Sequence, residues 1–235
     1  MKNILKRFSV GELALWCSSV MLIVVFFLIF DRSSYLSLAA SLIGVTSLIF
    51  CAKGDPIGQV LMIVFSLLYG FISLTFSYYG EMITYLGMSL PMAVFSLVSW
   101  VKNPYKGNKS EVKVSRLSLR AVTVISLLAV AVTVAFYFIL GAFDTANLIP
   151  STLSVATSFL AAALTFKRSP WYALAYAMND VVLIVLWSLA MLSDPSYISV
   201  TVCFAVFLVN DLYGFVNWRR MAKRQQRLDG ADGEG

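Results

Sequence analysis

The chain has 235 residues, of which 60% are apolar and only 13% charged. A soluble domain is usually near half apolar and about a quarter charged, so this composition indicates an all-α integral membrane protein. The chain has no histidine, which excludes imidazole acid–base chemistry and histidine metal ligation. Cys17, Cys51 and Cys203 lie in apolar segments without metal-ligand spacing, and we expect buried, unpaired thiols.

Apolar runs of about 18–24 residues predict eight transmembrane helices. In chain order they cover roughly residues 13–30, 35–52, 56–79, 81–100, 121–140, 147–166, 170–192 and 196–218. No small-residue cleavage site follows the first run, so an uncleaved helix is expected rather than a signal peptide. Pro91 lies inside the fourth run and predicts a kink there.

The basic residues are distributed unevenly between alternate loops. Residues 1–7, 52–55, 101–120, 167–168 and 219–227 hold 17 of the 18 Lys and Arg residues, and the opposite side holds only Arg32. The positive-inside rule therefore predicts that both termini are cytoplasmic. We interpret these basic loops as contacts with anionic lipid of the bilayer, because they lack the aromatic or groove-reading context of a nucleic-acid site.

Two segments of the chain resemble each other. CAKGDPIGQ (51–59) aligns with TFKRSPWYA (165–173) at an offset of 114, and FSLVSWVKN (95–103) aligns with YGFVNWRRM (213–221) at an offset of 118. One helix separates the two units, so both have the same orientation in the membrane. The predicted architecture is an N-terminal tail and accessory helix (1–34), a first triple-helix bundle (35–100), a cytoplasmic loop and linker helix (101–146), a second, parallel triple-helix bundle (147–218) and a cytoplasmic tail (219–235). We expect the end of that tail, LDGADGEG, to lack a fixed structure.

Polar residues near the middle of the seventh run are the main candidates for a site. Asn179 and Asp180 lie about 15 Å along the helix from Pro170, near the bilayer centre, where an ionisable group is costly. Tyr176, Asp180 and Trp187 share one helix face. A carboxylate between two aromatic rings suits a cationic or hydroxyl-rich aromatic ligand.

The eighth run carries a second polar group. Asn210, Tyr213 and Asn217 follow helical spacing on one face, and Asp211 lies on the adjacent face. Trp218, followed by two arginines, is interpreted as an interfacial anchor. Secondary candidates in the first repeat are Gln59, Tyr69 and Tyr85.

Three classes of function remain open for these side chains. Asp180 and Asp211 could form bundle-locking hydrogen bonds, as in a structural membrane protein, or belong to a substrate or proton site, as in a transporter. Intramembrane aspartate chemistry would require the two carboxylates within a few Å. We disfavour an enzyme because the sequence has no histidine and no nucleophile-elbow or metalloprotease motif. The internal duplication favours a transporter.

The segments SPWYALAYAMNDVVLIVLW and FLVNDLYGFVNWRR resemble the PnuC family of bacterial vitamin transporters, and the similarity spans about residues 35–221. The resemblance implies a SWEET-like fold and uptake of nicotinamide riboside by facilitated diffusion across the bacterial cytoplasmic membrane, with trapping by a separate cytoplasmic kinase. It implies no cofactor and no metal. It also places Trp171 and Tyr172 near the substrate, and its acid-x-Y-G-aromatic motif appears as Asp211 to Phe215.

The sequence departs from the family pattern in two places. The usual W-x-x-W keeps only Trp171, and the first repeat has Phe95-Ser96 where a Y-G pair is expected. Relatives of this family carry thiamine, riboflavin or deoxynucleosides, and these remain alternative substrates. The sequence is compatible with a homo-oligomer but does not specify one.

Overall fold

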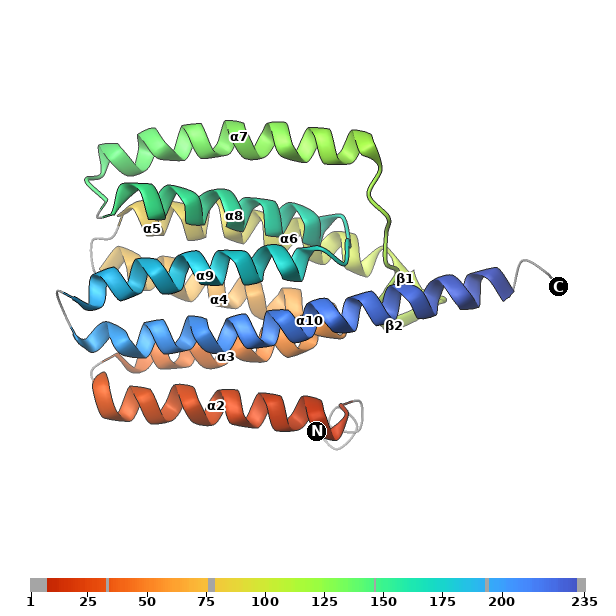
Figure 1. The fold of residues 1–235 in the computed structure, drawn as a ribbon, viewed down its shortest axis with the longest axis horizontal. Coiled ribbons are helices and arrows are strands. Elements are labelled where there is room, and N and C mark those ends of the chain that lie inside the picture. Colours follow the sequence, from red (N-terminus) through yellow and green to blue (C-terminus); the bar gives the residue numbers. More distant parts are fainter. Residues whose placement is uncertain (1–7, 33, 76–78, 146, 193–194, 232–235) are drawn as a thin grey trace.

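The structure is a computed structural model that describes residues 8–32, 34–75, 79–145, 147–192 and 195–231. Within these ranges eight helical segments are long and apolar enough to cross a membrane, and the prediction of an eight-helix membrane protein is confirmed. In chain order they are α2 (Val10–Phe30), α3 (Tyr35–Ala52), α4 (Ile57–Thr75), the composite segment α5–η1–α6 (Tyr79–Ile83, Thr84–Ser89, Leu90–Val101), α7 (Leu119–Ala142), α8 (Leu148–Phe166), α9 (Tyr172–Met191) and α10 (Ile198–Ala231), the last preceded by the short turn η2 (Pro195–Tyr197) (Figure 1).

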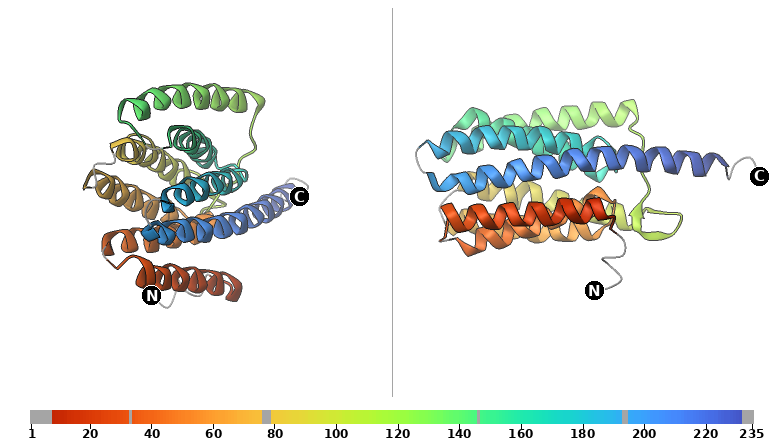
Figure 2. Two further views of the ribbon diagram at one scale, coloured as in Figure 1. Left: turned by 60° about the vertical axis from the view of Figure 1, so that its left-hand side comes forward. Right: turned by 60° about the horizontal axis from the view of Figure 1, so that its bottom comes forward.

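Six of these segments form a closed ring. The first unit contributes α3, α4 and α6, the second contributes α8, α9 and α10, and each helix packs against the next in that order, with α10 packing back on α3. The accessory helix α2 lies outside the ring against α3 and α10, and the linker helix α7 lies outside it against α8 (Figures 1 and 2). The two contacts between units are therefore α6 with α8 and α10 with α3.

The internal repeat is visible in the hydrogen bonds of two turns. After α3, Gly54 N–H donates to Cys51 O and Asp55 N–H to Phe50 O. After α8, the residues 114 positions later do the same, Arg168 N–H to Thr165 O and Ser169 N–H to Leu164 O. Gly54 and Arg168 both have positive φ, +70° and +55°. The two turns are thus equivalent, and both lie at the end of the bundle that carries the basic residues, here called the charged end.

The fourth and eighth segments differ from the prediction in detail. The fourth contains a π-helical turn, Thr84–Ser89, directly before Pro91, so the strain of the proline is absorbed by a wider turn. The eighth continues well past residue 218, to Ala231, because Gln225 and its neighbours pack on the loop described next. The expectation that the tail lacks structure is wrong for residues 228–231, and residues 232–235 lie outside the described ranges.

A short hairpin lies at the charged end, in the loop between α6 and α7. Strands β1 (Pro104–Tyr105) and β2 (Asn108–Val112) pair antiparallel around Lys106-Gly107, which both have positive φ, as a tight hairpin turn requires. Val112, the last residue of β2, is fully buried. The sequence reading treated this loop only as a carrier of positive charge.

The three cysteines are unpaired, as expected, but only two of them are buried. Cys51 and Cys203 lie in the interior, whereas Cys17 is exposed on the outer helix α2. Exposure on α2 is compatible with an apolar residue because this face of the helix has no protein neighbour and would meet lipid.

Candidate functional site

A cavity of about 130 Å³ lies inside the ring of six helices. Its wall includes Tyr176, Asn179, Asp180, Trp187 and Asp211, five of the residues singled out from the sequence. Gln59 and Tyr85 of the first unit also line it, but Tyr69 does not.

Equivalent positions of the two units face each other across this cavity. Seven pairs related by the repeat both contribute to the wall: Gly44 with Ser158, Leu48 with Ala162, Met62 with Tyr176, Phe65 with Asn179, Ser66 with Asp180, Ser89 with Phe207, and Ala93 with Asp211. In four of these pairs only the residue of the second unit is polar, in Ser66 with Asp180 both are, and in Ser89 with Phe207 only the residue of the first unit is. The fold is therefore repeated, but Asn179 and both aspartates of the cavity wall come from the second unit.

Asp180 and Asp211, here called the carboxyl pair, both line the cavity wall. Both side chains are nearly fully buried, at 4% and 5% exposure. Ionised carboxylates only accept hydrogen bonds, so a direct hydrogen bond between the two would need one proton on the pair. Oδ2 of Asp180 has no hydrogen-bond partner. One acceptor of the pair is thus available to a ligand or to water.

The amide of Asn179 is fixed by the helix beside it. Its Oδ1 accepts hydrogen bonds from the hydroxyls of Ser154, Thr157 and Ser158 of α8, at 3.2, 2.8 and 3.0 Å. The oxygen is saturated by these three donors, so only the amide N–H groups of Asn179 remain for a ligand.

The cavity continues toward the end opposite the charged end. A second hollow of about 500 Å³ shares Glu81, Thr145, Ser151, Leu186 and Trp187 with the central cavity. Trp187 stacks at a tilt on Tyr197, with ring centroids 5.3 Å apart. Glu81, half-buried at the junction, adds a third carboxyl group, and no lysine or arginine of the described residues lines the central cavity. The cavity is therefore acidic.

The other five predicted site residues lie outside the cavity wall. On α10, Asn210 donates to Ser19 Oγ at 2.9 Å and Tyr213 to Glu12 Oε1 at 2.9 Å, so both bind the accessory helix α2. Asn217 donates to Ala52 O of α3 at 2.8 Å. Successive residues turn by 100° around a helix, so this face points away from the cavity that Asp211 lines.

The aromatic residues at the start of α9 also contact protein rather than the cavity. Trp171 is half-exposed and packs on Phe215, with Arg219 over its ring at 5.2 Å. Tyr172 is buried against Trp218, with centroids 4.9 Å apart. Trp218 has no exposed surface, so the interpretation as an interfacial anchor is wrong.

Sequence reasoning missed two features of the site. Ser66 lines the cavity opposite Asp180, and its hydroxyl, like Asp180 Oδ2, is buried without a hydrogen-bond partner. The repeat offset of 114 would have found it, because residue 66 is the equivalent of residue 180. Glu81 was also missed, although a lone glutamate at the edge of an apolar run is a visible signal.

A ring of repeated helices around a polar cavity at mid-depth defines the class of the protein, a membrane transporter built from parallel repeats. The family model for the nicotinamide mononucleotide transporters matches residues 34–220, so the chain belongs to this family. The nicotinamide riboside transporter PnuC of Neisseria mucosa is 24% identical over 205 residues, which are 83% of this chain and 76% of that protein.

A solved structure has the same fold. The crystal structure of the vitamin B3 transporter PnuC matches with a TM-score of 0.78 at 22% identity, covering 93% of this chain and 94% of that one. The predicted PnuC-like fold is therefore confirmed, and the prediction that the chain is a transporter rather than an enzyme is confirmed by the family and its relatives.

Proposed function

We propose that this protein takes up nicotinamide riboside by facilitated diffusion, with the charged end in the bacterial cytoplasm. The observation that carries the proposal is the acidic central cavity, in which Asp180 keeps a buried, unpartnered oxygen. Nicotinamide riboside has a cationic pyridinium ring and ribose hydroxyls. The carboxyl pair would bind the charge or a hydroxyl, Tyr176 and Trp187 would pack on the ring, and the amide N–H groups of Asn179 would donate to ribose oxygens.

The same charges disfavour a phosphorylated substrate. The family name refers to the mononucleotide and the Neisseria relative to the riboside. A phosphate carries about two negative charges near neutral pH and is usually bound by arginine or lysine. No such residue of the described chain lines the cavity, so we infer that the riboside is the substrate.

The transport cycle that fits is alternating access around this cavity. In the present conformation the cavity joins the hollow at the end opposite the charged end, which is the external face if the positive-inside rule holds. Binding, closure and opening of the charged end would deliver the substrate to the cytoplasm. A separate kinase would trap it by phosphorylation, and a homo-oligomer stays a prediction.

The test is calorimetric titration of the purified protein with nicotinamide riboside, its mononucleotide, thiamine, riboflavin and a deoxynucleoside, followed by uptake into liposomes. We expect binding of nicotinamide riboside and uptake that equilibrates without ATP or an ion gradient. Accumulation above equilibrium should need the kinase and ATP inside the liposome. Thiamine is also cationic, and its binding alone would keep the mechanism but change the substrate; accumulation driven by a proton gradient would contradict facilitated diffusion.

A further inference from the structure

The two units are joined at the charged end by a reciprocal set of hydrogen bonds, here called the clasp. Trp100 Nε1 of α6 donates to Thr165 O of α8 at 3.0 Å, and Trp218 Nε1 of α10 donates to Cys51 O of α3 at 2.8 Å. Trp100 is the repeat equivalent of Trp218, and Cys51 is the equivalent of Thr165. Each unit therefore bonds to the other through the same pair of positions.

The residues that precede the two tryptophans repeat this exchange. Ser99 Oγ donates to Phe166 O at 2.8 Å, and Asn217 Nδ2 donates to Ala52 O at 2.8 Å. These positions too are related by the repeat. Each of the two contacts between units, α6 with α8 and α10 with α3, is thus closed at the charged end by two side-chain hydrogen bonds.

The same side chains block the axis of the ring. Both indoles are fully buried, and their ring centroids lie 5.3 Å apart. Tyr172 packs edge-on against Trp218 and Trp100. Ser96, one helical turn before Trp100, already lines the central cavity. The tryptophan pair is therefore the first layer that a ligand meets on its way from the cavity to the charged end.

The hairpin loop adds a second layer, here called the strap (residues 104–115). Val112 N–H donates to Gly54 O and Ser115 N–H to Arg168 O, both at 3.0 Å. Gly54 and Arg168 are the equivalent residues of the two turns, so the strap bonds to the same point of each unit. Their positive φ angles turn these carbonyls out of the helix ends toward the strap.

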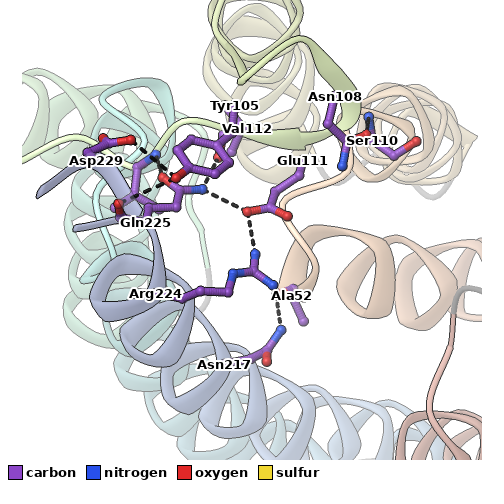
Figure 3. Close-up of polar contacts among 11 residues, drawn as sticks. Ala52, Tyr105, Asn108, Ser110, Glu111, Val112, Asn217, Arg224, Gln225 and Asp229 are labelled. Carbon is purple, nitrogen blue, oxygen red and sulfur yellow. Dashed lines mark hydrogen bonds and ion pairs between the residues drawn. The ribbon is translucent and has the colours of Figure 1, made fainter. Parts of the chain in front are cut away.

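The strap is held in place by the extended part of α10 (Figure 3). Gln225, only 4% exposed, donates to Val112 O at 3.0 Å and to Glu111 Oε1 at 2.8 Å, and accepts from Val114 N–H at 2.9 Å. Arg224 pairs with Glu111. Burial and the hydrogen bond to Asp229 raise the pKa of Tyr105, which keeps its hydroxyl protonated as a donor to that carboxylate at 3.2 Å.

We propose that the clasp and the strap form the inner gate of the transporter, with Trp100 and Trp218 as its paired closing residues and Gln225 as a positioning residue that holds the strap. The proposal rests on the alternating access proposed above. The charged end can open only if the two inter-unit contacts part, and this motion breaks the four clasp bonds and the strap's bonds to one of the two turns. The repeat makes the gate two-sided, since each unit supplies one tryptophan and one acceptor.

The test uses a Ser96→Cys protein in vesicles of both orientations and a membrane-impermeant thiol reagent. Mass spectrometry reads modification at position 96 separately from Cys17, Cys51 and Cys203, and proteolysis of the C-terminal tail shows which face carries the charged end. Trp100→Phe with Trp218→Phe removes both indole N–H donors but keeps an aromatic ring at each position. Trp16→Phe is the matched control, because Trp16 Nε1 donates to Thr46 Oγ1 at 3.1 Å between α2 and α3, with α2 outside the ring.

We expect the double variant to label at least fivefold faster from the charged face and no faster from the opposite face, while the control matches the parent. An unchanged rate, or equal acceleration from both faces as general loosening would give, overturns the proposal. If the double variant does not fold, Gln225→Ala replaces it. This variant should label at least twofold faster from the charged face and no faster from the opposite face. The labelling needs no substrate, so a parent that fails to bind nicotinamide riboside would defeat the proposed function without deciding the gate.

Discussion

The two triple-helix units share their hydrogen-bond pattern at the charged end and differ at the cavity. At the charged end they make the same turn and the same tryptophan bond to each other. At the cavity the second unit supplies Tyr176, Asn179, Asp180 and Asp211, where the first has Met62, Phe65, Ser66 and Ala93. The repeat is thus preserved where the units must part and meet symmetrically, and it has diverged where an asymmetric ligand would be bound.

The largest expected effect tests the symmetric end. Trp100→Ala and Trp218→Ala should each lower the free energy of unfolding by about 3–5 kcal/mol, because each removes a fully buried indole together with its hydrogen bond to a carbonyl of the other unit. The two losses should agree within about 2 kcal/mol, the spread that context gives to one buried substitution. Thermal unfolding in detergent measures both, and half-exposed Trp171→Ala is the control for a smaller loss. A large loss for one tryptophan alone would contradict the equivalence of the units.

The next effect tests the asymmetric cavity. Asp180→Asn should weaken binding of nicotinamide riboside about 10- to 100-fold, the range expected when a hydrogen bond to a charged group, about 1.5–3 kcal/mol, is lost. Calorimetric titration measures the change. Its matched control is Ser66→Ala, the equivalent position of the first unit, which we expect to change affinity less than threefold. Equal losses at both positions would mean that the ligand uses the two units alike.

A smaller effect comes from giving the second unit the side chain of the first. Tyr176→Met replaces the aromatic ring by the residue found at position 62 and should weaken binding about 2- to 10-fold, since a favourable ring contact contributes about 0.5–1.5 kcal/mol beyond its area. Met62→Leu keeps an apolar side chain on the opposite wall and should leave affinity nearly unchanged. Titration of both variants separates ring stacking from the filling of the cavity.

Much of this division was visible in the sequence. Apolar run lengths gave the eight helices, and the repeat offset gave the two parallel units, because both depend on local composition and chain order. The face shared by Tyr176, Asp180 and Trp187 lines the cavity because all three lie on one rigid helix. Helical spacing alone cannot tell which of two polar faces of α10 turns inward. Asn210 and Tyr213 were therefore singled out together with Asp211, although they bind α2.

The role of Trp218 could not be predicted for a related reason. A tryptophan before two arginines at the end of an apolar run is the usual pattern of a membrane-interface residue. Here Trp218 bonds to Cys51, which lies 167 positions earlier in the chain, and contacts Trp100, which lies 118 positions earlier. Such contacts depend on the closure of the six-helix ring.

The strap could not be predicted because its hairpin has only two short strands. Its stability depends on burial of Val112 against Gly54 and on the hydrogen bonds from Gln225.

The smallest effect concerns two serines of the first unit and tests whether the hydroxyl of Ser66 stabilises the fold. Ser47 Oγ donates to Gly58 O at 2.8 Å, whereas Ser66 Oγ is buried without a partner. Ser47→Ala should lower the free energy of unfolding by about 1 kcal/mol, the usual net value of a buried hydrogen bond. Ser66→Ala should leave it unchanged or raise it by up to about 1 kcal/mol, because an unsatisfied hydroxyl is removed. Thermal unfolding of the two variants without ligand makes the comparison. If Ser66→Ala is as damaging as Ser47→Ala, the hydroxyl has a partner in solution, and water in the cavity would be the first to consider.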